Sequence, residues 1–242
     1  MSRGRGFENL AVLLVSTSCL GQSTADDLGL RGSVPAPSGD IPPLVERVLR
    51  TQSRTVSDPE GLLARLDSRL DRLRTYSGHF TQVNYYAAAA LADTFSGTVS
   101  ARMPNDFVLL YDNPAGQFIL SDGERVRMYV PENEQVVEGS IQRAGDDLNF
   151  FRLMQDFLGY ADATVTGAGD SRQVKILPGS SGPVAELVLE VRVDDLLPRR
   201  IRVVDENRNI STYDISAIRV DDSIEDAVFQ PTLPEGVEIF RQ

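Results

Sequence analysis

The stretch that decides the fold is Met103–Gln135, with the sequence MPNDFVLLYDNPAGQFILSDGERVRMYVPENEQ. It predicts three consecutive β-strands: an apolar run at Phe107–Tyr111, a second at Gln117–Leu120, and a third at 125–130 in which apolar and polar residues alternate. Turn-forming residues separate these strands at 112–116 and 121–123. Nothing in the stretch indicates catalysis, and it predicts a sheet with one strongly apolar face.

A two-residue alternation continues on both sides of this stretch. Before it, we expect strands at 76–86 and 94–102. After it, alternation recurs at 173–177, 185–193, 199–204, 210–220 and 237–240. Short connections make consecutive strands antiparallel. The sequence therefore predicts one α+β domain, mainly β, with about ten antiparallel strands and two or three helices.

Two amphipathic helices are expected beside the strands. The first begins at Ser57-Asp-Pro-Glu60, which supplies a capping side chain and an early proline, and ends near Arg74. Its apolar stripe consists of Leu62, Leu63, Leu66, Leu70 and Leu73. The second, at 146–158, is short and unusually aromatic. Both apolar stripes need a cover, and the sheet is the simplest one.

The N-terminus has the organisation of a secretory signal at residues 1–25. Two arginines precede the apolar run Leu10–Val15, and Ser23-Thr-Ala25 offers a cleavage site before Asp26. The run is too short to span a bilayer, so we expect a soluble, exported protein. Cys19 follows Ser16-Thr-Ser18 and leaves an alternative open, in which the mature chain is anchored by an acylated cysteine. Residues 26–56 are rich in Gly, Pro and Ser and predict a disordered linker before a domain at 57–242.

The composition argues against several functional classes. The net charge is −11 with a pI near 4.6, which disfavours nucleic acid and anionic membrane surfaces as partners. Cys19 and His79 are the single cysteine and histidine, so neither a disulfide nor a zinc site is expected. No Gly-x-Ser-x-Gly or phosphate-binding motif occurs, and His79 lies on an expected strand. We predict a protein without enzymatic activity, cofactor or metal.

The apolar surface remains as the main indication of function. An antiparallel sheet with one apolar face under amphipathic helices either packs solidly or encloses a cavity. The strand pattern alone favours solid packing. Three phenylalanines on the short helix at 146–158 keep the second interpretation open, an apolar pocket beneath a movable lid.

The motifs of the central stretch resemble the outer-membrane lipoprotein carrier (LolA) family. The matching positions there are Pro104-Asn105, Phe107, Tyr111, Pro114, Ser121-Asp-Gly123, Tyr129, Pro131 and Gln135. Further matches outside it are Leu66–Leu70, Phe80–Gln82, Phe229 and Leu233–Val237. The resemblance covers about residues 58–241. It implies an unclosed antiparallel β-barrel of about ten to eleven strands, covered by a lid of two or three helices over a hydrophobic cavity.

The resemblance also implies a role and a set of partners. Members of the family carry acylated lipoproteins across the periplasm, from an inner-membrane ATP-driven release complex to an outer-membrane receptor or to the outer membrane itself. We expect a monomer. Two alternatives use the same fold: a lipid-anchored receptor acylated at Cys19, and a module with a filled core that mediates interactions in the cell envelope.

The resemblance places specific residues in the expected site. The acyl-chain cavity would be lined by Phe80, Phe95, Val99, Met103, Phe107, Leu109, Tyr111 and Met128. The lid would carry Phe150, Phe151, Met154 and Phe157. The family usually has a lid-latching arginine directly before the Pro-Asn pair, where this chain has Met103, with Arg102 one residue earlier. A one-residue shift reverses the face of a strand. Either a bulge turns Arg102 inward, or, as the pattern favours, the arginine latch is missing.

Overall fold

The computed structural model describes residues 58–104, 106–122, 124–140, 163–177, 184–233 and 235–241. Within them the protein is mostly β, with one sheet of 12 strands and one α-helix. The first half contains α3 (Pro59–Asp71), β1 (Thr75–Tyr86), β2 (Leu91–Arg102), β3 (Asp106–Asn113), β4 (Phe118–Asp122), β5 (Arg125–Val130), the 3-10 turn η2 (Pro131–Asn133) and β6 (Gln135–Ser140). The second half contains β7 (Ala163–Thr166), β8 (Ser171–Ile176), β9 (Val184–Arg192), β10 (Pro198–Asp205), β11 (Ile210–Val220), the 3-10 turn η3 (Asp226–Phe229) and β12 (Glu238–Arg241).

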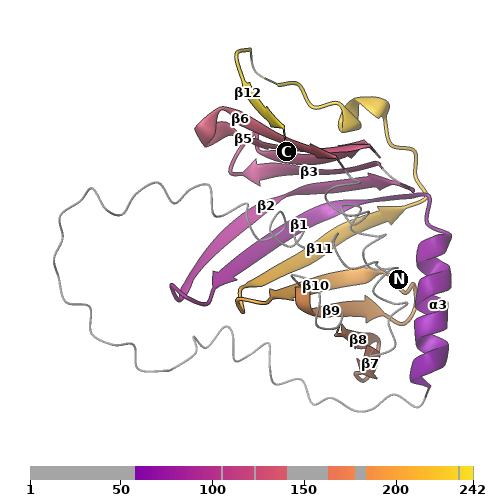
Figure 1. Cartoon of the computed structure of the whole chain (residues 1–242). Coiled ribbons are helices and arrows are strands. Elements are labelled where there is room, and N and C mark those ends of the chain that lie inside the picture. The colour runs from indigo at the N-terminus through magenta and orange to yellow at the C-terminus, as the bar shows by residue number, and fades with distance from the viewer. Residues whose placement is uncertain are drawn as a thin grey trace, which may run out of the picture.

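The sheet is open rather than closed into a barrel, as expected. Its strand order is β12-β6-β5-β4-β3-β2-β1-β11-β10-β9-β8-β7, so β12 and β7 form the two edges. Neighbours pair antiparallel except at one edge, where β12 runs parallel to β6. Figure 1 shows the strands curving around a common interior, with α3 standing across one end of them. The fold class predicted from the sequence is confirmed.

The helix α3 forms for the local reasons that the sequence indicates. The Asp58 carboxylate accepts a hydrogen bond from the Gly61 backbone N–H at 2.9 Å, and Pro59 occupies the first turn. Leu62, Leu66 and Leu70 are buried along one stripe, and Leu73 continues it beyond the helix. On the polar side, Arg69 donates to the Asp195 carbonyl in the β9–β10 connection. The helix is therefore fixed against the interior by its leucines and at its rim by an arginine.

Two apolar clusters lie on opposite faces of the sheet. The larger one, on the inner face, joins the α3 leucines to residues of β1–β5 and β7–β11. The smaller one, on the outer face, comprises Val108, Phe118, Leu120, Tyr129, Val136 and Phe229. The C-terminal segment 224–237 packs over this outer cluster. The expectation of a single apolar face is therefore wrong for β3–β6, where both faces are covered.

Two strands, β6 and β7, were not foreseen. In β6, Val136 belongs to the outer cluster while its neighbour Val137 packs against the inner one. A strand that is apolar on both faces loses the alternation by which strands are detected. β7 has only four residues, too few to show a period. The helix expected at 146–158 and residues 1–57 lie outside the described residues. No helix among those described has the length and hydrophobicity that a membrane crossing requires.

Candidate functional site

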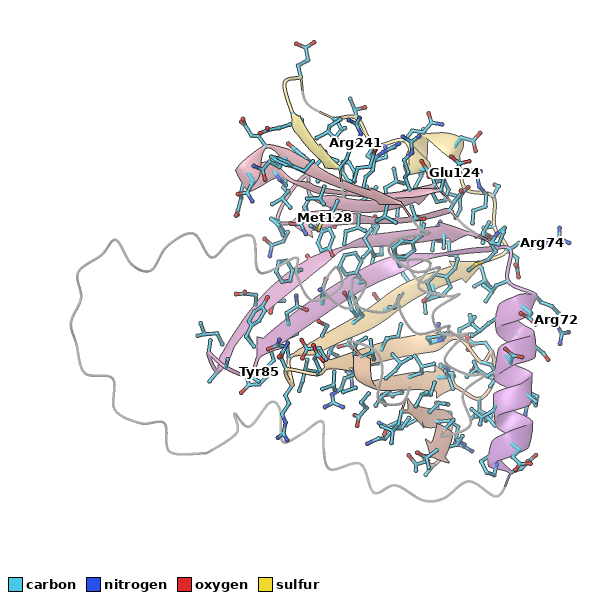
Figure 2. All side chains as sticks on the ribbon, in the orientation of Figure 1. Arg72, Arg74, Tyr85, Glu124, Met128 and Arg241 are labelled. Atoms are coloured by element: carbon cyan, nitrogen blue, oxygen red, sulfur yellow. The ribbon has the colours of Figure 1, made fainter. Side chains whose placement is uncertain are left out.

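The structure brings all eight residues predicted for the cavity wall together on the inner face. Six are buried members of the inner cluster: Phe80, Val99, Phe107, Leu109, Tyr111 and Met128. Phe95 and Met103 are half-buried and pack against them. Seven of the residues come from β1, β2, β3 and β5, and Met103 directly follows β2; Met128 is labelled in Figure 2. The family resemblance and the strand alternation together therefore selected side chains that share one apolar surface.

Strand register explains why these side chains meet. Val99 lies opposite Leu109, and Ala101 lies opposite Phe107. Residues directly opposite each other in an antiparallel pair project to the same face. Gly97 lies opposite Tyr111, and a Cβ at this glycine would come within 2.0 Å of the Leu110 carbonyl oxygen. Only glycine permits this close approach of β2 to β3.

Aromatic rings form the centre of the inner face. Phe80 and Tyr111 pack edge to face, with ring centroids 5.2 Å apart. Phe95 meets Tyr111 in the same way at 6.2 Å, and Tyr213 of β11 lies 6.4 Å from Phe80. Burial raises the pKa of the Tyr111 and Tyr213 hydroxyls, so both stay protonated at physiological pH. The rings form a neutral, largely apolar wall.

A polar group that sequence reasoning missed lies beside this wall. The Tyr111 hydroxyl donates to Gln82 Oε1 at 3.1 Å, and Gln82 Nε2 donates to Asn84 Oδ1 at 2.9 Å. Both amides are fully buried. The signal was available, because Gln82 and Asn84 follow Phe80 at two-residue spacing on the same strand. The inner face is therefore apolar over most of its area and polar along one line of residues.

Comparison of the sequence and the fold with known proteins identifies a family to which the chain is similar. The family model described as "Outer membrane lipoprotein carrier protein LolA" matches residues 71–232. The chain belongs to the LolA family. Outer-membrane lipoprotein carrier proteins of Bordetella avium and Hahella chejuensis are 22% and 25% identical to it, over 75% and 73% of this chain and 88% and 87% of theirs. The crystal structure of an uncharacterized conserved protein from Thermus thermophilus shares the fold, with a TM-score of 0.50, 13% identity, and coverage of 76% of this chain and 98% of that one.

In this LolA-family chain, Arg102 lies on the outer face. β2 pairs with β3 without a register shift from Gly97 to Arg102, so no bulge turns the arginine inward there. Its guanidinium binds Asp106 through Nε and Nη2 at 2.8 Å and Asp226 through Nη1 at 2.5 Å. Its Cζ lies 4.8 Å from the centre of the Phe229 ring. Hydrogen bonds to Asp226 and Asp106 raise the pKa of Arg102.

These contacts connect Arg102 to the C-terminal segment. Met103 packs half-buried against the inner cluster, at the position where the family usually has its arginine. The four residues predicted for the lid, Phe150, Phe151, Met154 and Phe157, lie outside the described residues. A lid held by apolar contacts without an arginine latch therefore stays a prediction.

A second group of charges on the outer face holds the C-terminal strand. Glu138 of β6 accepts hydrogen bonds from Arg127 at 3.0 Å and from Arg241 of β12 at 3.2 Å. The hydrogen bond from Arg127 is the largest of several contributions that hold the pKa of Glu138 below its usual range. Figure 2 labels Arg241 on the edge strand. One carboxylate thus joins β5, β6 and β12.

The pH dependence of stability provides a test of this carboxylate. The pKa of Glu138 is lower in the folded than in the unfolded chain. Its contribution to the free energy of unfolding is therefore complete above the pKa of the unfolded chain, about 4.3, and is lost as the pH falls through the pKa of the folded chain. We expect Glu138→Gln to flatten the fall in urea midpoint below about pH 4.3. Glu132→Gln, at an exposed site in η2, is the matched control. Equal slopes in wild type and Glu138→Gln would contradict the assignment.

An open depression of about 420 Å³ also occurs among the described residues, along the polar side of α3. Its lining consists of Ala64, Arg65, Ser68, Arg69, Arg72 and Leu196. Three of the six lining residues are arginines and the depression lies open to solvent, so it does not suit acyl chains. The inner face remains the candidate site.

Proposed function

We propose that this protein carries lipoproteins by enclosing their acyl chains against the inner face. The observation that carries the proposal is the joining of eight sequence-predicted wall residues into one apolar surface, in a chain of the LolA family. Acyl chains cannot cross water unshielded, because each CH₂ removed from water is worth about 0.8 kcal/mol. A curved, open sheet offers the necessary apolar surface without permanently closing it.

The proposed route rests on the signal predicted at 1–25 and on the resemblance to the LolA family. A signal at 1–25 would deliver the protein to the periplasm. There it would receive acylated lipoproteins from an inner-membrane ATP-driven release complex and pass them to an outer-membrane receptor or to the outer membrane itself. This work is non-enzymatic and requires no cofactor, and a monomer suffices for it.

Release requires a cover that opens. The segment 146–158 carries the aromatic residues predicted for that cover. Cargo moves to the next partner when that partner binds the acyl chains more favourably than the carrier does, so a weakly held cover is sufficient. Apolar contacts from the four lid residues would hold it, because Arg102 is engaged on the outer face.

Binding of an apolar fluorescent probe, and its displacement by acyl chains, tests the proposal. Phe107→Glu places a carboxylate in the wall of the inner face, and burying an unpaired charge is strongly unfavourable. We expect probe affinity to fall by more than about tenfold, which corresponds to 1.4 kcal/mol.

The adjacent Val108→Glu is the matched control, since Val108 is equally buried but lies in the outer cluster. Both variants should lose stability, but the folded fraction of Val108→Glu should still bind the probe. Failure of the wild-type protein to bind any acyl probe would refute the carrier proposal.

Cys19, which follows Ser16-Thr-Ser18, leaves a second candidate open, an anchored receptor of the same fold. The intact mass of the mature protein separates the two. A mature chain that begins at Asp26 excludes the anchored receptor, whereas a lipidated Cys19 supports it.

A further inference from the structure

Two buried polar atoms on the inner face have no hydrogen-bond partner among the described residues. They are Oγ of Ser211 in β11 and Nε2 of Gln117, the residue directly before β4. The residues are 1% and 3% exposed, so bulk water does not satisfy these atoms. A buried polar atom without a partner costs folding free energy, and its presence in a native structure calls for a physical reason.

Pairing places both atoms beside the polar residues of the inner face. Ser211 lies directly opposite Asn84 in the β1–β11 pair. The Gln117 carbonyl accepts a hydrogen bond from the Tyr111 N–H at 2.9 Å, which continues the β3–β4 register and puts Gln117 on the face of Tyr111. The two atoms therefore flank the hydrogen-bonded series from Tyr111 through Gln82 to Asn84. We call these five residues the polar belt: Gln117, Tyr111, Gln82, Asn84 and Ser211.

The polar belt crosses the inner face away from α3. β1 begins just after α3 and passes Tyr76 and Phe80 before it reaches Gln82 and Asn84. Tyr85, next to Asn84, is labelled in Figure 2 at the end of β1 opposite the helix. The portion nearer α3 is lined by leucines and other apolar side chains. The inner face thus has an apolar end and a polar end.

The chemistry of the unsatisfied atoms indicates what they bind. An amide nitrogen only donates hydrogen bonds, and a serine hydroxyl can donate one. A ligand group that pairs with either atom must present an acceptor there while the rest of the ligand remains apolar. The two ester carbonyls of a diacylglyceryl group meet this requirement, since each lies at the head of a hydrocarbon chain.

We propose that the polar belt hydrogen-bonds the ester carbonyls of the bound diacylglyceryl group, with the hydrocarbon chains directed toward α3. This inference rests on the proposed carrier function. It adds an orientation to that function: the head of the lipid, and whatever is attached to it, would lie at the end of the sheet near the β1–β2 turn.

The test compares two ligands that differ only in their carbonyls. A diacylglycerol carries two esters, and a dialkylglycerol of equal chain length carries ethers instead. We expect the wild-type protein to prefer the diacylglycerol by about 2- to 10-fold for each carbonyl bound. A diacylglyceryl-cysteine peptide and a phosphatidylglycerol, which carry the same two esters, then report whether the attached molecule is a lipoprotein or a phospholipid.

Three variants locate the preference. Ser211→Ala and Gln117→Leu each remove an unsatisfied atom, so the fold should be retained while the preference for the ester falls by the same 2- to 10-fold factor per carbonyl. Affinity for the dialkylglycerol should not fall in either variant. Thr212→Ala removes a hydroxyl from the neighbouring position of β11, which faces the other side of the sheet, and should leave the preference unchanged. Infrared spectra of ¹³C-labelled esters should show hydrogen-bonded carbonyls in wild type and fewer of them in the two belt variants.

The outcomes distinguish a failure of the polar-belt inference from a failure of the proposed carrier function. Equal affinity of the wild-type protein for both ligands overturns the role of the polar belt and leaves the carrier proposal standing. A preference that survives in the Ser211→Ala, Gln117→Leu double variant also overturns it. Absence of binding to either ligand refutes the carrier proposal, and the inference fails with it.

Discussion

Phe229→Ala is expected to release the C-terminal segment from the outer face while the rest of the sheet stays folded. Phe229 is 8% exposed, belongs to the outer cluster and lies against the Arg102 guanidinium. Truncating a buried phenylalanine costs about 3–5 kcal/mol. Its other anchors are smaller: the partly buried Ile224, Val228, Leu233 and Val237, the four-residue pairing of β12 with β6, and the ion pairs at Asp226 and Arg241. Such a loss exceeds what these exposed charges can compensate.

Hydrogen exchange and limited proteolysis measure this release directly. In Phe229→Ala, the β12 amides should exchange faster and cleavage within 222–241 should increase, while the central strands keep their protection. Phe240→Ala is the matched control, since Phe240 follows the segment in β12 but is 42% exposed. Unchanged protection of β12 in Phe229→Ala would show that the outer cluster does not hold the segment.

The residues of the inner face could be predicted because the alternation of apolar and polar residues along a strand indicates which side chains share a face. Phe107, Leu109 and Tyr111 face inward as their spacing indicates, and the leucine stripe of α3 buries as its period indicates. Both features depend on local geometry alone. Alternation separates one face from the other, but it does not say what covers each face.

Three features that the sequence did not predict depend on contacts between residues far apart in the chain: the outer cluster, the pairing of β12 with β6, and the polar belt. The outer cluster exists because 224–237 returns to cover β3–β6, a contact across about a hundred residues that no local period reports. The parallel pairing of β12 with β6 has the same origin. The polar belt also depends on such pairing, since Ser211 reaches Asn84 only when β11 aligns with β1.

Leu66→Ala is expected to lower the free energy of unfolding by about 2–5 kcal/mol. Leu66 is fully buried at the centre of the α3 stripe, where its side chain joins the helix to the inner cluster. A domain of this kind has only about 5–15 kcal/mol in total, so the loss should be large in a urea titration. Arg65→Ala, one position away on the exposed side, should change the free energy by less than about 0.5 kcal/mol.

The Leu66→Ala variant also tests how α3 relates to the acyl site. A ligand present at 100 times its dissociation constant stabilises the folded state by about 2.7 kcal/mol. If acyl chains lie against the inner face beside α3, added acyl ligand should restore much of the stability that Leu66→Ala loses. The reason is that the bound ligand and the Leu66 side chain contact the same apolar surface. Val108→Ala, a truncation in the outer cluster, should respond to the ligand only as the wild-type protein does. A loss under about 1 kcal/mol in Leu66→Ala would mean that α3 does not close the inner cluster in solution.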